Sequence, residues 1–172
     1  MSLLVGEEFD RLFTSFEHTA FRLEVRDRYD SSYENESLRR FLADEPDDLP
    51  WMQDWLAMIR AATAAGRRFS RVRVVSRPLT DYSRFGVWCS QFTGGAGEDI
   101  RYLVRDMAKS VGIPNHDYWL FDSSKLVRMH FDDADRFIGA EIIDDPAVVV
   151  RHCFWRDAAW HYAVRRDEFA AA

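Results

Sequence analysis

Aromatic side chains are unusually frequent in this chain, and they constrain its fold more than any other feature. They make up 15% of the 172 residues, with six Trp, six Tyr and thirteen Phe. A buried ring removes roughly 150–250 Å² from water, and a chain of this length can bury about two thirds of the surface it exposes when unfolded. Most rings fall on the apolar phase of predicted helices and strands. We therefore expect a core packed with rings, with an aromatic-lined pocket or partner surface as the alternative.

The spacing of apolar residues predicts an α+β fold. Helical spacing of three and four residues recurs in residues 7–17, 32–43, 50–65, 79–92, 105–111 and 146–169. Strand patterns occur in residues 21–25, 71–74, 100–104, 118–121, 126–131 and 137–143. Turn residues join the last three strands into an antiparallel meander. We expect a mixed sheet with this C-terminal meander and with helices mainly on one face, the largest being 51–65 and 146–169.

One domain covering residues 1–172 is expected from the length. The glycine-rich run at residues 93–97 is predicted to break the preceding helix. If the chain has two halves, they meet near residues 93–98. The same run could cradle a phosphate, but it lacks the Lys-Ser/Thr of a P-loop, which favours a simple connector.

Charge and cysteine content narrow the classes of function. The net charge is −6, which disfavours nucleic acid as a partner. Neither Cys89 nor Cys153 lies in a metal-binding or CxxC motif, so we expect two free thiols, buried and unreactive. The first residues lack a signal-peptide pattern, and no apolar run reaches membrane-spanning length. We predict a cytoplasmic protein without a membrane partner.

The basic segment at residues 67–77 is the polar feature that stands out most, because it holds five arginines and no acid. On a strand, Arg71 and Arg73 share one face with Phe69. These arginines could bind a carboxylate or phosphate, or could neutralise acids of the same chain. Glu24 and Arg26, on the polar face of the predicted strand 21–25, could form a ladder with them or line a pocket with Trp or Tyr walls. The sequence does not choose between these arrangements.

Two histidine motifs have simple structural explanations. His130 is followed by three aspartates at positions 132, 133 and 135, a cluster that could hold a cation or act in acid–base chemistry. The spacing does not fit a calcium loop, and an acidic turn between strands explains it. His116 and Asp117 are neighbours in extended chain, so each is expected to pair with other elements.

Several motifs resemble a known family. They are the runs 21–29, 97–101 (GEDIR), 117–122 (DYWLFD), 127–131 (VRMHF), 144–146 (DDP) and 155–160 (WRDAAW). Together they resemble the actinobacterial domain-of-unknown-function family 6879, whose members are often encoded beside helix-turn-helix regulators. The resemblance implies an accessory or regulatory role and supplies no catalytic residues. The C-terminal third is also loosely similar to phospholipase-D-like modules, but His130-Phe131-Asp132 lacks the Lys of their catalytic motif.

Our leading hypothesis is a non-enzymatic regulatory or protein-binding accessory domain that acts with a helix-turn-helix regulator. The alternative is a small-molecule sensor or hydrolase that binds an anionic ligand through the arginine-rich strand. We expect no catalytic residues, metal or cofactor. The candidate ligand- or partner-binding residues are Arg67, Arg71, Arg73, Arg101, Trp119, Arg128 and His130.

Overall fold

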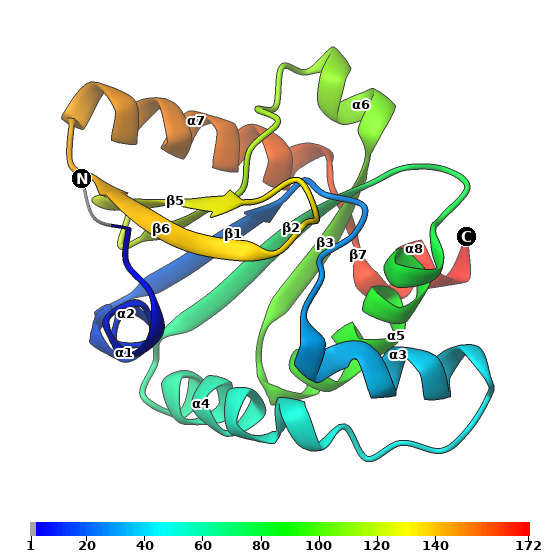
Figure 1. Ribbon diagram of the computed structural model, residues 1–172. Helices are drawn as coiled ribbons and strands as arrows, with labels where there is room; N and C mark the ends of the chain where they lie inside the picture. The colour runs from blue at the N-terminus through cyan, green and yellow to red at the C-terminus, as the bar shows by residue number, and fades with distance from the viewer. Residues whose placement is uncertain (1–2) are drawn as a thin grey trace.

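A computed structural model describes residues 3–172, so residues 1 and 2 of the predicted domain 1–172 lie outside it. The described chain forms one seven-stranded sheet in the order β6-β5-β4-β1-β2-β3-β7 (Figure 1). The strands are β1 (Thr19–Glu24), β2 (Arg68–Val75), β3 (Asp99–Val104), β4 (Tyr118–Phe121), β5 (Lys125–Phe131), β6 (Phe137–Ile143) and β7 (Val164–Arg165). The central strands β1, β2 and β3 are parallel, and all other pairs are antiparallel.

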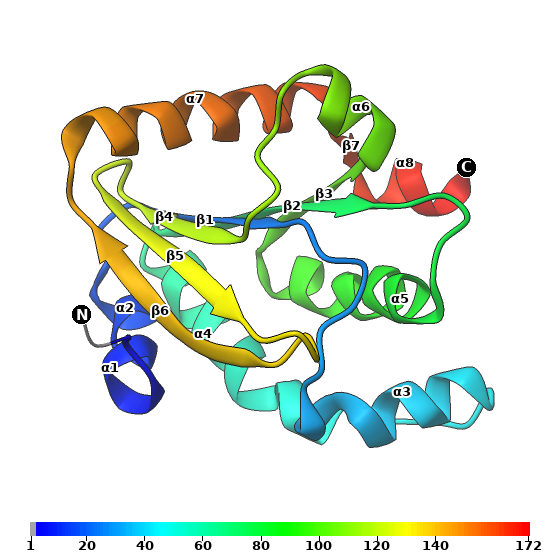
Figure 2. The same ribbon diagram turned by 45° about the horizontal axis from the view of Figure 1, so that its top comes forward.

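Helices cover both faces of the sheet (Figure 2). They are α1 (Gly6–Asp10), α2 (Leu12–Ser15), α3 (Asn35–Leu42), α4 (Gln53–Ala64), α5 (Asp81–Ala96), α6 (Arg105–Ser110), α7 (Pro146–Tyr162) and α8 (Arg166–Ala171), with short 3-10 turns at Ser32–Glu34 and Pro50–Met52. Helices α1 to α5 pack on the face that carries Phe69 and Trp119. Helices α6 and α7 pack on the face that carries Phe21 and Val72. In residues 3–172, no helix is both long enough and apolar enough to cross a membrane.

The predicted α+β class, the mixed sheet and the C-terminal antiparallel strands are confirmed. The prediction of one helix from 146 to 169 is wrong, because α7 ends at Tyr162 and Ala163 is extended. The chain then adds the two-residue edge strand β7, which pairs with β3 and has too few residues to show an alternating pattern.

The predicted helix break at residues 93–97 is also wrong. Helix α5 continues through Gly94 and Gly95 to Ala96 and is capped by Gly97, whose φ of 121° is in the region that favours glycine. A Cβ on Gly97 would overlap the Thr63 side chain of α4, so this glycine also allows the two helices to approach closely. Strands from both sides of this segment belong to the same sheet.

Strand β1 is more deeply buried than its alternating sequence predicts. Its apolar residues Phe21 and Leu23 face α7, while Arg22, only 3% exposed, lies beneath the α4–α5 layer. In the register of β1 with β2, Arg22 lies opposite Arg71 and Glu24 opposite Arg73. Charged side chains of two central strands therefore face the interior, and this arrangement determines the candidate site.

The glycines of α5 provide a test of this local structure. We expect Gly97→Ala to destabilise the protein by about 1–3 kcal/mol, because alanine is strained at this φ and meets Thr63. Gly94→Ala is the control: its Cβ would meet nothing within 4 Å, and alanine favours a helix by up to about 1 kcal/mol. Urea denaturation measures both changes. A loss of stability in Gly94→Ala would contradict the helical assignment.

Candidate ligand-binding cavities

Glu24, at the end of β1, is the centre of a buried charge network. Its carboxylate lies 2.5 Å from Arg71 Nη1, 2.7 Å from Arg73 Nε and 3.6 Å from Arg22 Nε. Burial alone would raise its pKa, but the ion pairs with Arg71, Arg73 and Arg22 outweigh burial and lower the pKa of Glu24 to about 2. Glu24 is therefore charged at neutral pH in an interior site.

Further acids complete the network on either side. Arg71 Nε donates to Glu98 Oε1 at 2.8 Å, and Arg22 Nη2 donates to Asp117 Oδ2 at 2.6 Å. The Tyr29 hydroxyl also donates to Asp117, at 2.6 Å. Three arginines thus share three carboxylates. Of the two explanations that the sequence allows for the arginine-rich strand, the structure shows the internal one for Arg71 and Arg73: they pair with acids of the same chain.

A cavity of about 570 Å³ lies on this network, between the sheet and the helices α4 and α5; we call it the interlayer cavity. Trp119 forms part of its floor, and the guanidinium carbons of Arg22 and Arg71 lie 5.7 and 5.5 Å from the Trp119 ring centroid. The aromatic residues that line the cavity are Phe9, Phe13, Tyr29, Tyr33, Trp51, Trp55, Tyr82, Phe85, Trp119 and Phe131. The charged ladder and the ring-walled pocket, which the sequence left as alternatives, therefore occur together.

Several polar atoms at the cavity have incomplete hydrogen bonding. Within residues 3–172, the buried Glu98 Oε2 has no hydrogen-bond partner. Arg73 Nε lies near Glu24 without the alignment of a hydrogen bond. Glu34 accepts from the Tyr82 hydroxyl at 2.9 Å, and burial raises the Glu34 pKa. These two unpartnered atoms are themselves buried, but the Arg73 side chain is 24% exposed and lines the cavity with Glu34, so a ligand there could meet a donor and an acceptor.

Gly86 of α5 makes room for the network. A Cβ at this position would overlap the Arg73 guanidinium, so the glycine leaves room for that side chain where it lies. The Tyr102 hydroxyl donates to Gly86 O at 3.3 Å and to Ser90 Oγ at 3.1 Å, which fixes α5 against β3. The position of Arg73 is thus set by backbone packing as well as by charge.

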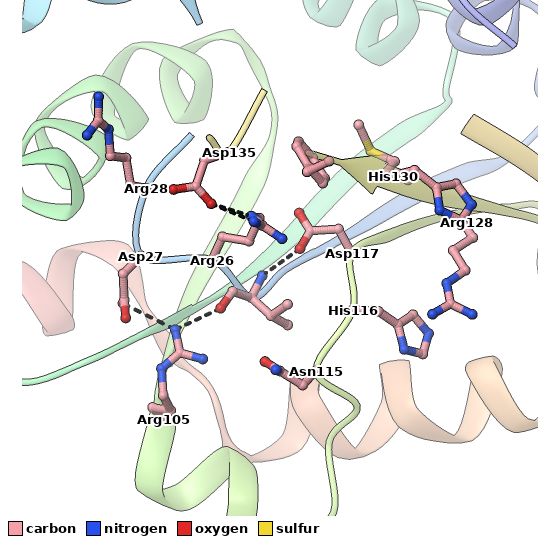
Figure 3. A pocket seen from close by; sticks show the side chains of 13 residues that line it. Arg26, Asp27, Arg28, Arg105, Asn115, His116, Asp117, Arg128, His130 and Asp135 are labelled. Atoms are coloured by element: carbon pink, nitrogen blue, oxygen red, sulfur yellow. Dashed lines mark hydrogen bonds and ion pairs between the residues drawn. The ribbon is translucent and has the colours of Figure 1, made fainter. Parts of the chain in front are cut away.

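A second hollow of about 530 Å³, the carboxyl-edge pocket, lies where β1 and β3 end and β4 begins (Figure 3). It is lined by Val25, Arg26, Asp27, Arg28, Arg105, Asn115, His116, Asp117, Arg128, Met129, His130, Phe131 and Asp135. Open α/β sheets bind ligands at the carboxyl ends of their parallel strands, so the place is a plausible one for a ligand. Met129, Phe131 and Asp135 line both cavities.

His116 is neutral in this pocket. His152 Nδ1 lies 2.8 Å from Val148 O and must carry a proton to donate there. His152 Nε2 is then an acceptor for His116 Nε2–H at 2.9 Å. Burial, with Arg128 and His152 nearby, lowers the pKa of His116 to about 4.

The predicted site residues fall into three places. Arg71, Arg73 and Trp119 line the interlayer cavity, and Arg128 and His130 line the carboxyl-edge pocket.

The other two predicted residues line neither cavity. Arg67 donates to the Thr14 and Phe16 carbonyls, and the Arg101 guanidinium stacks 3.8 Å from the Trp160 ring centroid. Both arginines contact residues that are far from them in the sequence, so local spacing does not predict these contacts.

Other lining residues were missed from the sequence. Glu98 follows a glycine-rich run that predicts a connector, and Tyr33 and Glu34 lie at the start of a predicted helix, yet all three line the interlayer cavity. Trp51 was assigned to a buried helix stripe. The one available signal was the excess of aromatic residues, which does not indicate which rings border a cavity.

The remaining motifs have structural roles. Asp132 accepts from the backbone N–H groups of Ala134 and Arg136, and Asp135 binds Arg26, so the aspartate run forms a turn. Both cysteines are free thiols, but only Cys89 is buried as expected, and burial raises its pKa to about 12; Cys153 is half-buried, so the expectation is wrong for it. Among residues 3–172, no three His, Cys, Asp or Glu side chains are grouped so as to hold a metal ion.

Comparison with known proteins places this fold in a family. Residues 7–171 match the family described as a domain of unknown function, DUF6879. The chain belongs to that family, and the match covers nearly all of the described residues. No curated protein matches the chain.

The charge network predicts a large effect of neutralising Glu24. We expect Glu24→Gln to destabilise the protein by about 3–5 kcal/mol, because three buried arginines lose their shared carboxylate. Glu36→Gln is the matched control: two arginines also lower the pKa of Glu36 to about 2, but the group is fully exposed. Denaturant unfolding should show little change for Glu36→Gln. Equal losses in the two variants would contradict the network.

The lowered pKa of Glu24 predicts that the stability of the folded protein depends on pH. Its folded pKa of about 2 is below the ordinary 4.5, so its stabilisation is complete above pH 4.5 and is lost as the pH falls toward 2. The free energy of unfolding should therefore fall over this interval, and the slope should be smaller in Glu24→Gln.

Proposed function

We propose that this protein is a small-molecule-binding domain whose ligand occupies the interlayer cavity. The observation that carries the proposal is a cavity of about 570 Å³ with aromatic walls and a charged floor. Ligand sites are commonly concave, of about 300–1,000 Å³, apolar in their walls and equipped with a few placed polar groups.

The cavity lining suggests the class of ligand. Rings stack favourably on planar molecules, and Tyr33 and Trp51, with centroids 5.6 Å apart, form an aromatic pair. The Glu34 carboxylate, an acceptor, and the Arg73 guanidinium, a donor, line the cavity together. We propose a planar heterocycle that carries both hydrogen-bond donors and acceptors.

A simple anion suits this cavity poorly. Arg71 and Arg73 already neutralise Glu24 and Glu98, and an added negative charge would compete with those carboxylates. The proposal therefore departs from the anionic ligand expected for the arginine-rich strand. Of the alternative hypothesis it keeps the small-molecule sensor, and the activity proposed is binding rather than hydrolysis.

Tyr33 allows a test, because it lines the cavity and its ring is 64% exposed. We expect at least one of adenine, guanine, indole and nicotinamide to quench tryptophan fluorescence saturably and to raise the melting temperature. Tyr33→Ala should weaken this binding about three- to tenfold, from the loss of one ring contact.

Tyr162→Ala is the control, since Tyr162 is 47% exposed and lies outside the cavity. It should leave the affinity unchanged. If none of the four compounds binds, or if both tyrosine variants bind equally well, the proposed ligand class is wrong.

Partner binding is a second candidate function. Val150 and Phe154, one turn apart on α7, are 67% and 65% exposed and form an apolar stripe on the outer layer of the fold. Exposed apolar patches often mark protein interfaces. We propose that this stripe contacts a helix-turn-helix regulator in the cytoplasm of an actinobacterial cell, as the family resemblance implies.

Co-purification with the regulator encoded nearest to the gene tests this second candidate. We expect Val150→Ser/Phe154→Ser to reduce the recovered regulator at least about fivefold, because burial of both side chains is lost. Val5→Ser, which also removes a 55% exposed valine, should not reduce recovery. Equal recovery with all three proteins would exclude the α7 stripe as the interface.

A further inference from the structure

The carboxyl-edge pocket has an excess of positive charge. Three carboxylates line it, and an arginine already pairs with each: Asp27 with Arg105 at 3.2 Å, Asp117 with Arg22 at 2.6 Å and Asp135 with Arg26 at 2.5 Å. Two further lining arginines, Arg28 and Arg128, have no carboxylate within ion-pair distance among residues 3–172. The pocket therefore favours a negatively charged ligand.

Arg128 has no carboxylate partner, and the acid nearest to it on the neighbouring strand contacts another side chain. Glu141 lies directly opposite Arg128 in the β5–β6 register, but its carboxylate is 3.3 Å from His130 Nε2. Figure 3 shows the Arg128 guanidinium beside His116, on the same side of the pocket. A cation without a partner thus lies at a preformed hollow.

Further donors lie along the same side of the pocket. Arg105 uses Nε for Ser76 and Nη2 for the Val25 and Val74 carbonyls, which leaves Nη1 without a hydrogen bond. Figure 3 shows the Arg105 and Asn115 side chains close to one another, followed by His116 and Arg128. The bonds that Arg105 makes to two strand ends hold its guanidinium in place, so this donor is preorganised.

We propose that the carboxyl-edge pocket binds the phosphate group of a small phosphorylated molecule through Arg128, and that Arg105 and Asn115, further along the same side, meet other polar groups of that molecule. The donors come from β5, from the start of α6 and from the segment before β4. A phosphate carries about two negative charges at pH 7, so a pocket with two unpaired arginines attracts it more strongly than it attracts a carboxylate. The pocket volume of about 530 Å³ leaves room for the rest of the molecule.

This site does not depend on the interlayer cavity. The donors proposed here do not line that cavity, and the residues common to both hollows are Met129, Phe131 and Asp135. Variants of Arg128 and of Tyr33 therefore separate the two proposals, because each should affect one ligand only.

Calorimetric titration of the full chain with inorganic phosphate at low ionic strength tests the site. We expect saturable binding that Arg128→Gln weakens about tenfold or more, through loss of a charge-assisted hydrogen bond. Arg60→Gln is the matched control, because Arg60 is exposed on α4, outside the pocket. Acetate should bind more weakly than phosphate.

Proton NMR locates the bound ion. Phosphate should shift the imidazole resonances of His116 in the wild type, and leave those of the exposed His161 unchanged. The proposal is overturned if wild-type protein shows no saturable binding, if Arg128→Gln and Arg60→Gln bind equally, or if His161 shifts as much as His116.

Discussion

The rest of the structure depends on one carboxylate shared by three arginines. Burying an unpaired charge costs several kcal/mol, so the sheet face that carries Arg22, Arg71 and Arg73 could not be covered by helices without a compensating acid. Glu24 supplies that acid because the parallel register of β1 and β2 places it opposite Arg73. Compensation by Glu24 thus allows α4 and α5 to close over a polar interior and still leave a cavity there.

The two hollows on either side of this network differ in electrostatic character. The interlayer cavity has walls of aromatic rings and a lining that holds three arginines and six acids, which suits a planar ligand without negative charge. The carboxyl-edge pocket keeps Arg128 without a carboxylate partner, which suits an oxyanion. The Arg22–Asp117 ion pair joins them, because Arg22 lines the first and Asp117 the second.

The sequence predicted the positions of helices and strands better than the contacts that their side chains make. Local periodicity was sufficient for β1 to β6 and for α4 and α5, since helix and strand patterns are local properties. It failed at Gly94, which stays inside α5 although glycine usually breaks a helix, and at β7, which is too short to carry a pattern. The sequence offers Glu24 as one possible partner of Arg71 and Arg73, but Glu24 is 47 residues away from Arg71 in the chain and the sequence does not choose between this pairing and a pocket. Strand register, which sets that contact, is a tertiary property.

The ionisation of Glu24 tests the central claim most directly. Carbon-13 NMR of the Glu24 side-chain carboxyl can follow its titration in the folded protein as the pH is lowered. The account predicts that Glu24 stays ionised at pH 3.5 and titrates near 2, because three arginines offset its burial. Titration at 4.5 or above would show that the arginines do not hold this carboxylate and would contradict the account.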